Sequence, residues 1–358
     1  MNQPSQTFPK NAWYVACTAA ELDHIDGKPF GRKICNEAMV FFRNEQGAVA
    51  ALEDFCPHRG APLSLGTVCA GKLTCGYHGL EMGCEGKTIA MPSQRVRGFP
   101  AIKVFPAVER YGFIWVWPGD AAQADTASIQ HLAWFDKPAW AYGGGLYHIN
   151  CDYRLMVDNL MDLTHETYVH ASTIGQKEID EVPCKTSVDG DTVITSRFMS
   201  GIMAPPFWKM ALRGNKLADD VPVDRWQVCR FTPPSNVHIE VGVAHAGYGG
   251  IDAPDDKKVY AIVTDFITPE SDTSIWYFWG MARKFQPADA ALTDSVREGQ
   301  GKIFSEDREM LERQQKNILA YPERKLLMLN IDEGGQKSRK VIARLIQAEI
   351  AAENAVLV

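Results

Sequence analysis

The 358-residue chain lacks the features that mark membrane, secreted and nucleic-acid-binding proteins. It has no apolar stretch long enough to span a bilayer, and residues 1–10 are polar, without the apolar core of a signal peptide. It has no run of basic residues, and its net charge of −7 disfavours a nucleic-acid partner. No Gly-x-Gly-x-x-Gly pattern follows a predicted strand, so we expect no dinucleotide-binding fold. These absences predict a cytoplasmic protein with no membrane or nucleic-acid partner.

Disulfide bonds are also not expected, although the chain has nine cysteines. Two of them lie in the motif described next, which leaves an odd number at irregular spacings. Because no secretion signal is present, we expect the remaining cysteines to be reduced thiols. They are Cys17, Cys35, Cys69, Cys84, Cys151, Cys184 and Cys229.

What the chain does contain is a pair of Cys–His motifs, Cys56-Pro57-His58 and Cys75-Gly76-Tyr77-His78, separated by sixteen residues. Two Cys and two His in this arrangement are typical of a Rieske [2Fe–2S] cluster, in which two His replace two Cys on one iron. A structural zinc site with the same four ligand types is the alternative. Each half of the motif mixes one Cys with one His, and glycines flank the ligands, which favours the cluster. The segment therefore predicts an electron-transfer centre.

A second group of potential metal ligands lies between residues 158 and 170, in a stretch with helical character. Asp162 and His165 are three residues apart and would share a helix face. His165 and His170 are five residues apart, which separates them by about 140° on a regular helix. Both can therefore bind one metal ion only if the helix ends or bulges between them. Two His and a carboxylate are the ligands of non-haem Fe(II) oxygenases, which consume the single electrons that a Rieske cluster delivers.

The order of predicted elements indicates an α+β protein with two domains. Residues 1–118 contain short apolar or alternating runs between turn residues, so we expect a small all-β domain that holds the cluster. Residues 119–358 mix strand-like runs at 193–195, 237–241, 259–263 and 275–279 with helical patterns at 153–170, 303–319 and 338–353. An antiparallel sheet wrapped on long helices is expected in this larger domain.

Taken together, the two motifs resemble those of the Rieske non-haem iron aromatic oxygenases, and the wider chain is similar to vanillate O-demethylase oxygenase subunits. The resemblance covers nearly the whole chain and implies a catalytic domain of helix-grip type. Beyond the metal motifs, the similar stretches are Trp13–Cys17, Glu53–Pro62, Asp152–Met156, Asp158–His170, Phe207–Gly214 and Val241–Gly247.

The resemblance implies a role for each candidate ligand. Cys56 and Cys75 would bind one iron of the cluster, and His58 and His78 would bind the other. His165 and His170 would bind the mononuclear iron together with Asp307 of a late helix. The chemistry of the segment alone does not choose Asp307 over Glu306 or Glu309.

Asp162 would connect the two metal centres. In the family this residue bridges a cluster His, here His78, to an iron-ligating His across the junction between two subunits. A closed head-to-tail assembly is required for such a contact, and the resemblance implies a homotrimer. We therefore expect the contact between His78 and Asp162 to lie between chains and not within one.

The resemblance also implies an activity, namely the oxidative demethylation of vanillate by O2 to 3,4-dihydroxybenzoate and formaldehyde. Hydroxylation of the methoxy carbon would give a hemiacetal that breaks down to these products. Electrons would come from NADH through a separate reductase that carries flavin and a [2Fe–2S] centre. A Rieske oxygenase acting on a different methoxybenzoate or another aromatic acid remains the alternative. An electron carrier without its own chemistry would be shorter and would lack the second metal site.

Substrate contacts are harder to predict from the chain. A methoxybenzoate needs a mostly apolar pocket with a few polar groups that fix its orientation. Asn236 corresponds to a carboxylate-binding Asn in a relative that acts on a methoxybenzoate herbicide. Arg230 and His245, on nearby predicted strands, are the alternatives.

Overall fold

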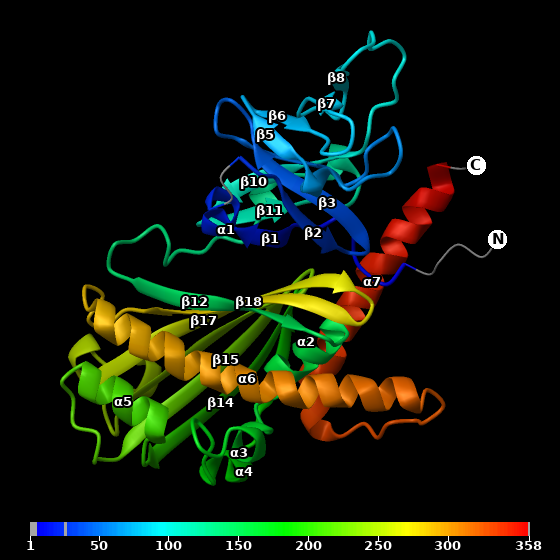
Figure 1. The fold of residues 1–358 in the computed structure, drawn as a ribbon. Coiled ribbons are helices and arrows are strands. Elements are labelled where there is room, and N and C mark those ends of the chain that lie inside the picture. Colours follow the sequence, from blue (N-terminus) through cyan, green and yellow to red (C-terminus); the bar gives the residue numbers. More distant parts are fainter. Residues whose placement is uncertain (1–5, 25–26, 357–358) are drawn as a thin grey trace. The chain divides into compact units, whose positions relative to one another are not determined.

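The structure is a computed structural model that describes residues 6–24 and 27–356 (Figure 1). The chain divides into two compact units. The first contains the chain up to residue 131 together with residues 268–272 and those after 345, and the second contains residues 132–267 and 273–345. Residues 119–131 thus group with the first unit, and the domain boundary predicted after residue 118 remains a prediction. None of the described helices combines the length and the apolar composition that a membrane-spanning segment needs.

The first unit is built from three small antiparallel sheets, as the alternating runs predict. One sheet has the order β1 (Tyr14–Thr18), β11 (Phe113–Val116) and β10 (Ala107–Arg110). The second has the order β2 (Phe30–Ile34), β3 (Glu37–Arg43), β4 (Val49–Glu53) and β9 (Val104–Phe105). The third has the order β5 (Thr67–Cys69), β6 (Lys72–Thr74), β7 (Glu81–Met82) and β8 (Thr88–Ala90).

One short helix in this unit, α1 (Ala19–Asp23), was not predicted. Thr18 and Glu21 form a capping box, in which the Thr18 side chain accepts from the Glu21 N–H and the Glu21 side chain accepts from the Thr18 N–H. Each satisfies a backbone donor that an isolated helix end leaves open. The Thr-x-x-Glu spacing was therefore a signal for this helix in the sequence.

The second unit is a seven-stranded antiparallel sheet with helices against it (Figure 1). The strand order is β12 (Ala141–Ile149), β18 (Ser274–Arg283), β17 (Lys258–Ser271), β16 (Asn236–His245), β15 (Val223–Thr232), β14 (Thr192–Ile202) and β13 (Lys185–Asp189). The helices are α2 (Tyr153–Met161), α3 (Glu166–Val169), α4 (Glu178–Glu181), α5 (Pro206–Gly214), α6 (Ala290–Ala320) and α7 (Glu333–Val356). Short 3₁₀ turns occur at Leu63–Leu65, Ala121–Gln123, Thr126–Ser128, Gly250–Asp252, Asp255–Lys257 and Asn330–Asp332. The predicted α+β architecture, a β unit followed by a large sheet with long helices, is confirmed.

The two faces of the large sheet differ in what covers them. The pairing of β15 with β16 and of β16 with β17 has no register shifts. In this pairing Gln227 lies opposite Val241, and Arg225 lies opposite Val243. Arg225 and Gln227 both bond Glu166 of α3, so their face is the one that the helices cover. Because side chains alternate along a strand, Trp226 and its neighbours two residues apart point to the opposite face. This alternation decides below which residues can reach the site.

Candidate metal centres

Two turns of the same design carry the Cys–His motifs. The N–H of each cysteine donates to the carbonyl five residues further on, over 2.9 Å at Cys56 and 2.8 Å at Cys75. The carbonyl of each cysteine accepts from the glycine four residues further on, Gly60 or Gly79. Both glycines have positive φ, 69° and 73°, which side chains other than glycine rarely adopt. The glycines predicted to support tight turns around the ligands therefore do so.

Burial separates the thiol ligands from the imidazole ligands. Cys56 and Cys75 are each 2% exposed, whereas His58 and His78 lie on the surface with ring centroids 4.6 Å apart. Burial raises the pKa of the Cys56 thiol, and its hydrogen bond and charge interaction with Cys75 raise it further, so the two sulfurs are neighbours. A cluster bound here would have its two thiolates in the interior and its two imidazoles toward solvent. This arrangement fits an electron relay whose exit is through His.

A group of clustered metal ligands gives a second candidate centre, separate from the Cys–His turns. A metal ion could be held by three or more His, Cys, Asp or Glu residues whose ligand atoms lie close together. Within the described part of the chain, one such group has ligand atoms that all lie within 4.8 Å of one another. That group does not contain the Cys–His motifs.

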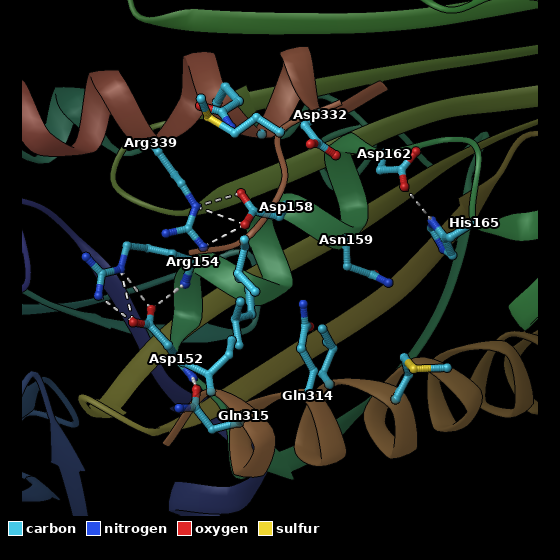
Figure 2. Close-up of a pocket in the computed structure, with 18 of the residues that line it drawn as sticks. Asp152, Arg154, Asp158, Asn159, Asp162, His165, Gln314, Gln315, Asp332 and Arg339 are labelled. Atoms are coloured by element: carbon cyan, nitrogen blue, oxygen red, sulfur yellow. Dashed lines mark hydrogen bonds and ion pairs between the residues drawn. The ribbon is translucent and has the colours of Figure 1, made fainter. Parts of the chain in front are cut away.

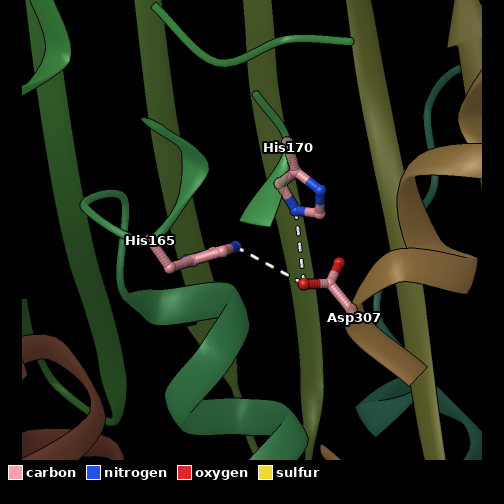
Figure 3. Close-up of side chains that lie close together, drawn as sticks. All are labelled: His165, His170 and Asp307. Carbon is pink, nitrogen blue, oxygen red and sulfur yellow. Dashed lines mark ion pairs between the residues drawn. The ribbon is translucent and has the colours of Figure 1, made fainter. Parts of the chain in front are cut away.

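The group that the structure does bring together is His165, His170 and Asp307 (Figure 3). Asp307 Oδ1 lies 3.5 Å from His165 Nε2 and 3.2 Å from His170 Nε2. Asp307 and His170 are buried, and His165 is partly exposed. We call these three residues the facial trio. Two neutral imidazoles and one carboxylate on the same side of a point leave room for further ligands, as in non-haem iron sites.

A broken helix allows the two histidines to converge. Helix α2 ends before Asp162, whose φ of −99° and ψ of 116° are extended, and the single-turn helix α3 then begins after His165. His170 ends α3 with φ −107° and ψ 29°. The helix therefore does not continue through the pair, as their five-residue spacing required.

Polar side chains surround the facial trio and fix its donors. Asn159 Nδ2 donates to Asp307 Oδ1 over 2.9 Å, and Glu306 Oε2 lies 2.8 Å from His170 Nδ1. Asp162 Oδ2 lies 3.9 Å from His165 Nδ1, a buried nitrogen with no hydrogen-bond partner in the described structure. Carboxylates behind metal-binding histidines orient the rings and raise their basicity. The spacing of ligands predicted neither Glu306 nor Asn159 for this position.

The electrostatics of His170 also suit a cation site. Burial alone would lower the pKa of His170. The hydrogen bond and charge of Asp307 and the hydrogen bond of Glu306 act in the opposite direction and together raise this pKa to about 9. Without a cation, the site therefore holds a proton between two carboxylates. A metal ion must displace that proton when it binds.

Comparison with known proteins places these two centres in a family. Residues 12–106 match the Rieske [2Fe-2S] domain, and residues 149–348 match the vanillate O-demethylase oxygenase C-terminal domain. The chain is 72% identical to a vanillate O-demethylase oxygenase subunit of Pseudomonas sp., over 98% of each chain. It is 35% identical to the oxygenase component of dicamba O-demethylase of Stenotrophomonas maltophilia, over 96% of this chain and 100% of the relative. The structure of dicamba monooxygenase bound to 3,6-dichlorosalicylic acid matches with a TM-score of 0.88 at 33% identity, over 96% of this chain and 99% of that chain.

The chain belongs to the vanillate O-demethylase oxygenase family. It is thus a Rieske non-haem iron oxygenase, and its N-terminal unit carries the Rieske [2Fe–2S] domain. The Cys–His turns lie in the segment that matches the Rieske domain, and the facial trio lies in the segment that matches the C-terminal domain.

A cavity of about 640 Å³ lies beside the facial trio within the second unit (Figure 2). Asp162 and His165 line it on one side, and two ion pairs, Arg154 with Asp152 and Arg339 with Asp158, line it elsewhere. Further parts of its wall come from α2, α6, α7 and the exposed apolar segment 326–328. The cavity therefore gives the surroundings of Asp162 access from outside the unit.

The three residues predicted to contact the substrate lie on neighbouring strands, Arg230 on β15 and Asn236 and His245 on β16, and their roles remain predictions. Asn236 and Arg230 lie on the strand positions that alternate with the helix-facing ones, so their side chains point away from the facial trio. Arg230 instead pairs with Glu240 across that opposite face, over 3.3 Å. His245 is the last residue of β16, and its Nε2 lies 3.0 Å from the carbonyl oxygen of Ala218, so its role remains a prediction.

Proposed function

We propose that this chain is the oxygenase subunit of a two-component vanillate O-demethylase. It would convert vanillate, with O2 and electrons derived from NADH, to 3,4-dihydroxybenzoate and formaldehyde. The observation that carries this proposal is the 72% identity to a vanillate O-demethylase oxygenase subunit over 98% of both chains. The facial trio and the paired Cys–His turns, which the activity requires, support it independently.

In this proposal His165, His170 and Asp307 hold a mononuclear Fe(II). Such an iron would supply the hydroxylation of the methoxy carbon by O2 and two electrons, and the resulting hemiacetal would break down to a phenol and formaldehyde. Asn159 fixes the Asp307 carboxylate by donating to Oδ1, and Glu306 holds the ring of His170 through Nδ1. Burial of Asp307 and His170 keeps bulk water away from that side of the site.

The first unit receives the electrons. Cys56, Cys75, His58 and His78 would hold one [2Fe–2S] cluster, with its imidazoles exposed to a partner. A separate reductase that carries flavin and a [2Fe–2S] centre would supply them, because the sequence shows no dinucleotide-binding pattern. The exposed His58 and His78 rings are the points at which electrons would enter and leave.

We further propose that the chain forms a homotrimer in which the cluster of one subunit serves the iron of the next. His78 of one chain would contact Asp162 of its neighbour. Exposed apolar side chains accompany both residues: Phe55 and Tyr77 in the cluster turns are 51% and 60% exposed, and Leu326, Leu327 and Met328 beside Asp162 are 69%, 87% and 76% exposed. Apolar patches of this kind mark protein contacts. A cytoplasmic location and a role in breaking down lignin-derived aromatic acids complete the proposal.

Product analysis tests the proposed function. The full-length iron-loaded protein, its reductase, NADH and vanillate should give formaldehyde and 3,4-dihydroxybenzoate in equal amounts. Asp307→Ala should abolish both products, whereas Glu309→Gln, on an exposed position two residues away, should retain them. NADH oxidation without formaldehyde from vanillate, but with formaldehyde from another methoxybenzoate, would assign the enzyme to that other acid.

A further inference from the structure

A buried carboxyl group lies on the helix-covered face of the large sheet, outside the facial trio. Asp265 of β17 is 0% exposed. Its Oδ1 accepts a hydrogen bond of 2.6 Å from the hydroxyl of Tyr277 on β18. Its Oδ2 is buried without a hydrogen-bond partner in the described structure. Because an unpaired buried carboxyl oxygen is destabilising, this atom calls for a partner.

Strand register places Asp265 in the same layer as the facial trio. Asp265 pairs with Val237, and two residues along, Val263 pairs with Ile239, so these side chains share the helix-covered face. The Tyr277 ring packs against Phe304 with centroids 5.3 Å apart, and Phe304 precedes Asp307 by one helical turn on α6. The Asp265 and Tyr277 pair thus lies between the sheet and the helix that supplies the carboxylate of the trio.

This layer also contains further buried polar atoms without hydrogen-bond partners in the described structure. Ile239 lies on β16, the central strand of the sheet, yet its side chain is only half-buried. Gln227 Oε1 and Trp279 Nε1, on the same face, are buried and have no hydrogen-bond partner in the part of the chain that the structure describes. Apolar and aromatic walls with a few convergent polar atoms are the composition of a small-molecule site.

Charge decides which group of an aromatic acid this corner accepts. Among the described residues, no arginine or lysine contributes to the pKa shift of Asp265. The negative charge of Asp307 does contribute to it. Burial raises the pKa of Asp265 well above its ordinary value, and this effect outweighs the lowering by the Tyr277 hydrogen bond. A ring carboxylate would be buried here without a cation to compensate its charge, whereas a hydroxyl can both donate to and accept from Oδ2.

We propose that Asp265, held in place by Tyr277, binds the ring hydroxyl of the aromatic substrate and selects hydroxylated over unhydroxylated methoxybenzoates. The inference rests on the proposed function, because it assumes an aromatic methyl ether in this layer. Asp265 is then a substrate-binding residue, and Tyr277 is a positioning residue that keeps Oδ2 free for the substrate.

Binding of two matched acids to the iron-loaded protein, without O2, tests the inference. Vanillate and 3-methoxybenzoate differ only in the ring hydroxyl, and we expect the wild-type chain to bind vanillate roughly tenfold more tightly. Asp265→Leu should reduce this preference to within about twofold, because it removes the partner of the hydroxyl. Tyr277→Phe should reduce it in part. Tyr142→Phe is the matched control, since it removes a tyrosine hydroxyl that bonds Thr264 on the opposite face of the same sheet.

The outcomes separate this inference from the proposed function. If wild-type protein releases formaldehyde from vanillate but Asp265→Leu keeps the tenfold preference, the inference is wrong and the function stands. If wild-type protein releases no formaldehyde from vanillate, the proposed function fails. Asp265→Ala, which also removes the partner of the hydroxyl, replaces Asp265→Leu if the latter does not fold. An unchanged preference in both Asp265→Ala and Tyr277→Phe would equally overturn the inference.

Discussion

Glu306 shows how single residues next to the facial trio control its ligands. Its Oε2 lies 2.8 Å from His170 Nδ1 and also accepts from the Thr173 hydroxyl over 3.4 Å. A carboxylate in this position orients the imidazole and increases its basicity, and losing such a partner weakens metal binding by roughly 10–100-fold. We expect Glu306→Gln to lower the affinity for Fe(II) by that factor while the cluster remains intact.

Titration of the iron-depleted protein with Fe(II) against a competing chelator measures this effect. Glu309→Gln is the matched control, because Glu309 is an exposed glutamate on the same helix that pairs with Arg313 over 2.8 Å. Equal affinities in the two variants would contradict a role for Glu306 in holding His170.

For single residues, the sequence predicted the metal-binding side chains better than the side chains that hydrogen-bond to them. The residues Cys56, Cys75, His165 and His170 could be proposed from their types and spacing alone. Asp307 could not be told from Glu306 or Glu309 by chemistry, and only packing shows that Asp307 Oδ1 faces both histidines while Glu306 stands behind one of them. Contacts that join residues more than a hundred positions apart leave no periodic signal in the chain.

Among the elements, the one-turn helix α3 depends on a buried ion pair. Glu166 directly follows His165, and its carboxylate accepts from Arg225 over 2.9 Å and from Gln227. Arg225 also donates to the Ile174 carbonyl over 3.0 Å, so it ties α3 and the loop after His170 to the sheet. Both charges are buried. The pair therefore fixes the segment that carries two of the three trio residues.

Breaking this pair should be costly. Arg225→Met leaves the Glu166 carboxylate buried without its partner, and we expect the free energy of unfolding to fall by about 3–5 kcal/mol. Arg230→Met on the same strand breaks a partly exposed pair with Glu240 and should cost less than about 1 kcal/mol. Denaturant unfolding of both variants makes the comparison, and Glu166→Gln should recover part of the loss in the Arg225→Met background. Similar losses in the two single variants would show that α3 does not depend on Arg225.

The elements themselves were predicted where periodicity was strong. The break between α2 and α3 followed from the His165 and His170 spacing, but α6 begins at Ala290 and not near residue 303. Its first turns contain Gly299 and Gly301 and few apolar residues, so they lack a helical pattern. Contacts with the sheet stabilise them, since the Gly301 carbonyl accepts from the Tyr147 hydroxyl over 2.9 Å. The sequence also did not show which face of the sheet Asn236 and Arg230 occupy, because only strand register shows this.

For the whole molecule, Asp162 is the residue that links the two metal centres in this account. Its Oδ1 accepts from the Thr164 N–H and hydroxyl, and its Oδ2 points toward His165 Nδ1 (Figure 2). We expect Asp162→Asn to keep both metal centres and to lose nearly all turnover, because electrons no longer pass from cluster to iron. Metal content together with formaldehyde release measures both properties. Asp189→Asn, on an exposed position of β13, serves as control, and full coupled activity in Asp162→Asn would exclude the bridge.

Mixed assemblies test the central claim most directly, namely that the working site combines the cluster of one chain with the iron of another. Cys75→Ser removes a cluster ligand, Asp307→Ala removes an iron ligand, and assemblies of either variant alone should be inactive. Co-expressed in equal amounts, the two should regain roughly a quarter of wild-type formaldehyde release, because about one junction in four joins an intact cluster to an intact iron. Mixed assemblies that stay inactive, although each variant retains its other centre, would contradict the account.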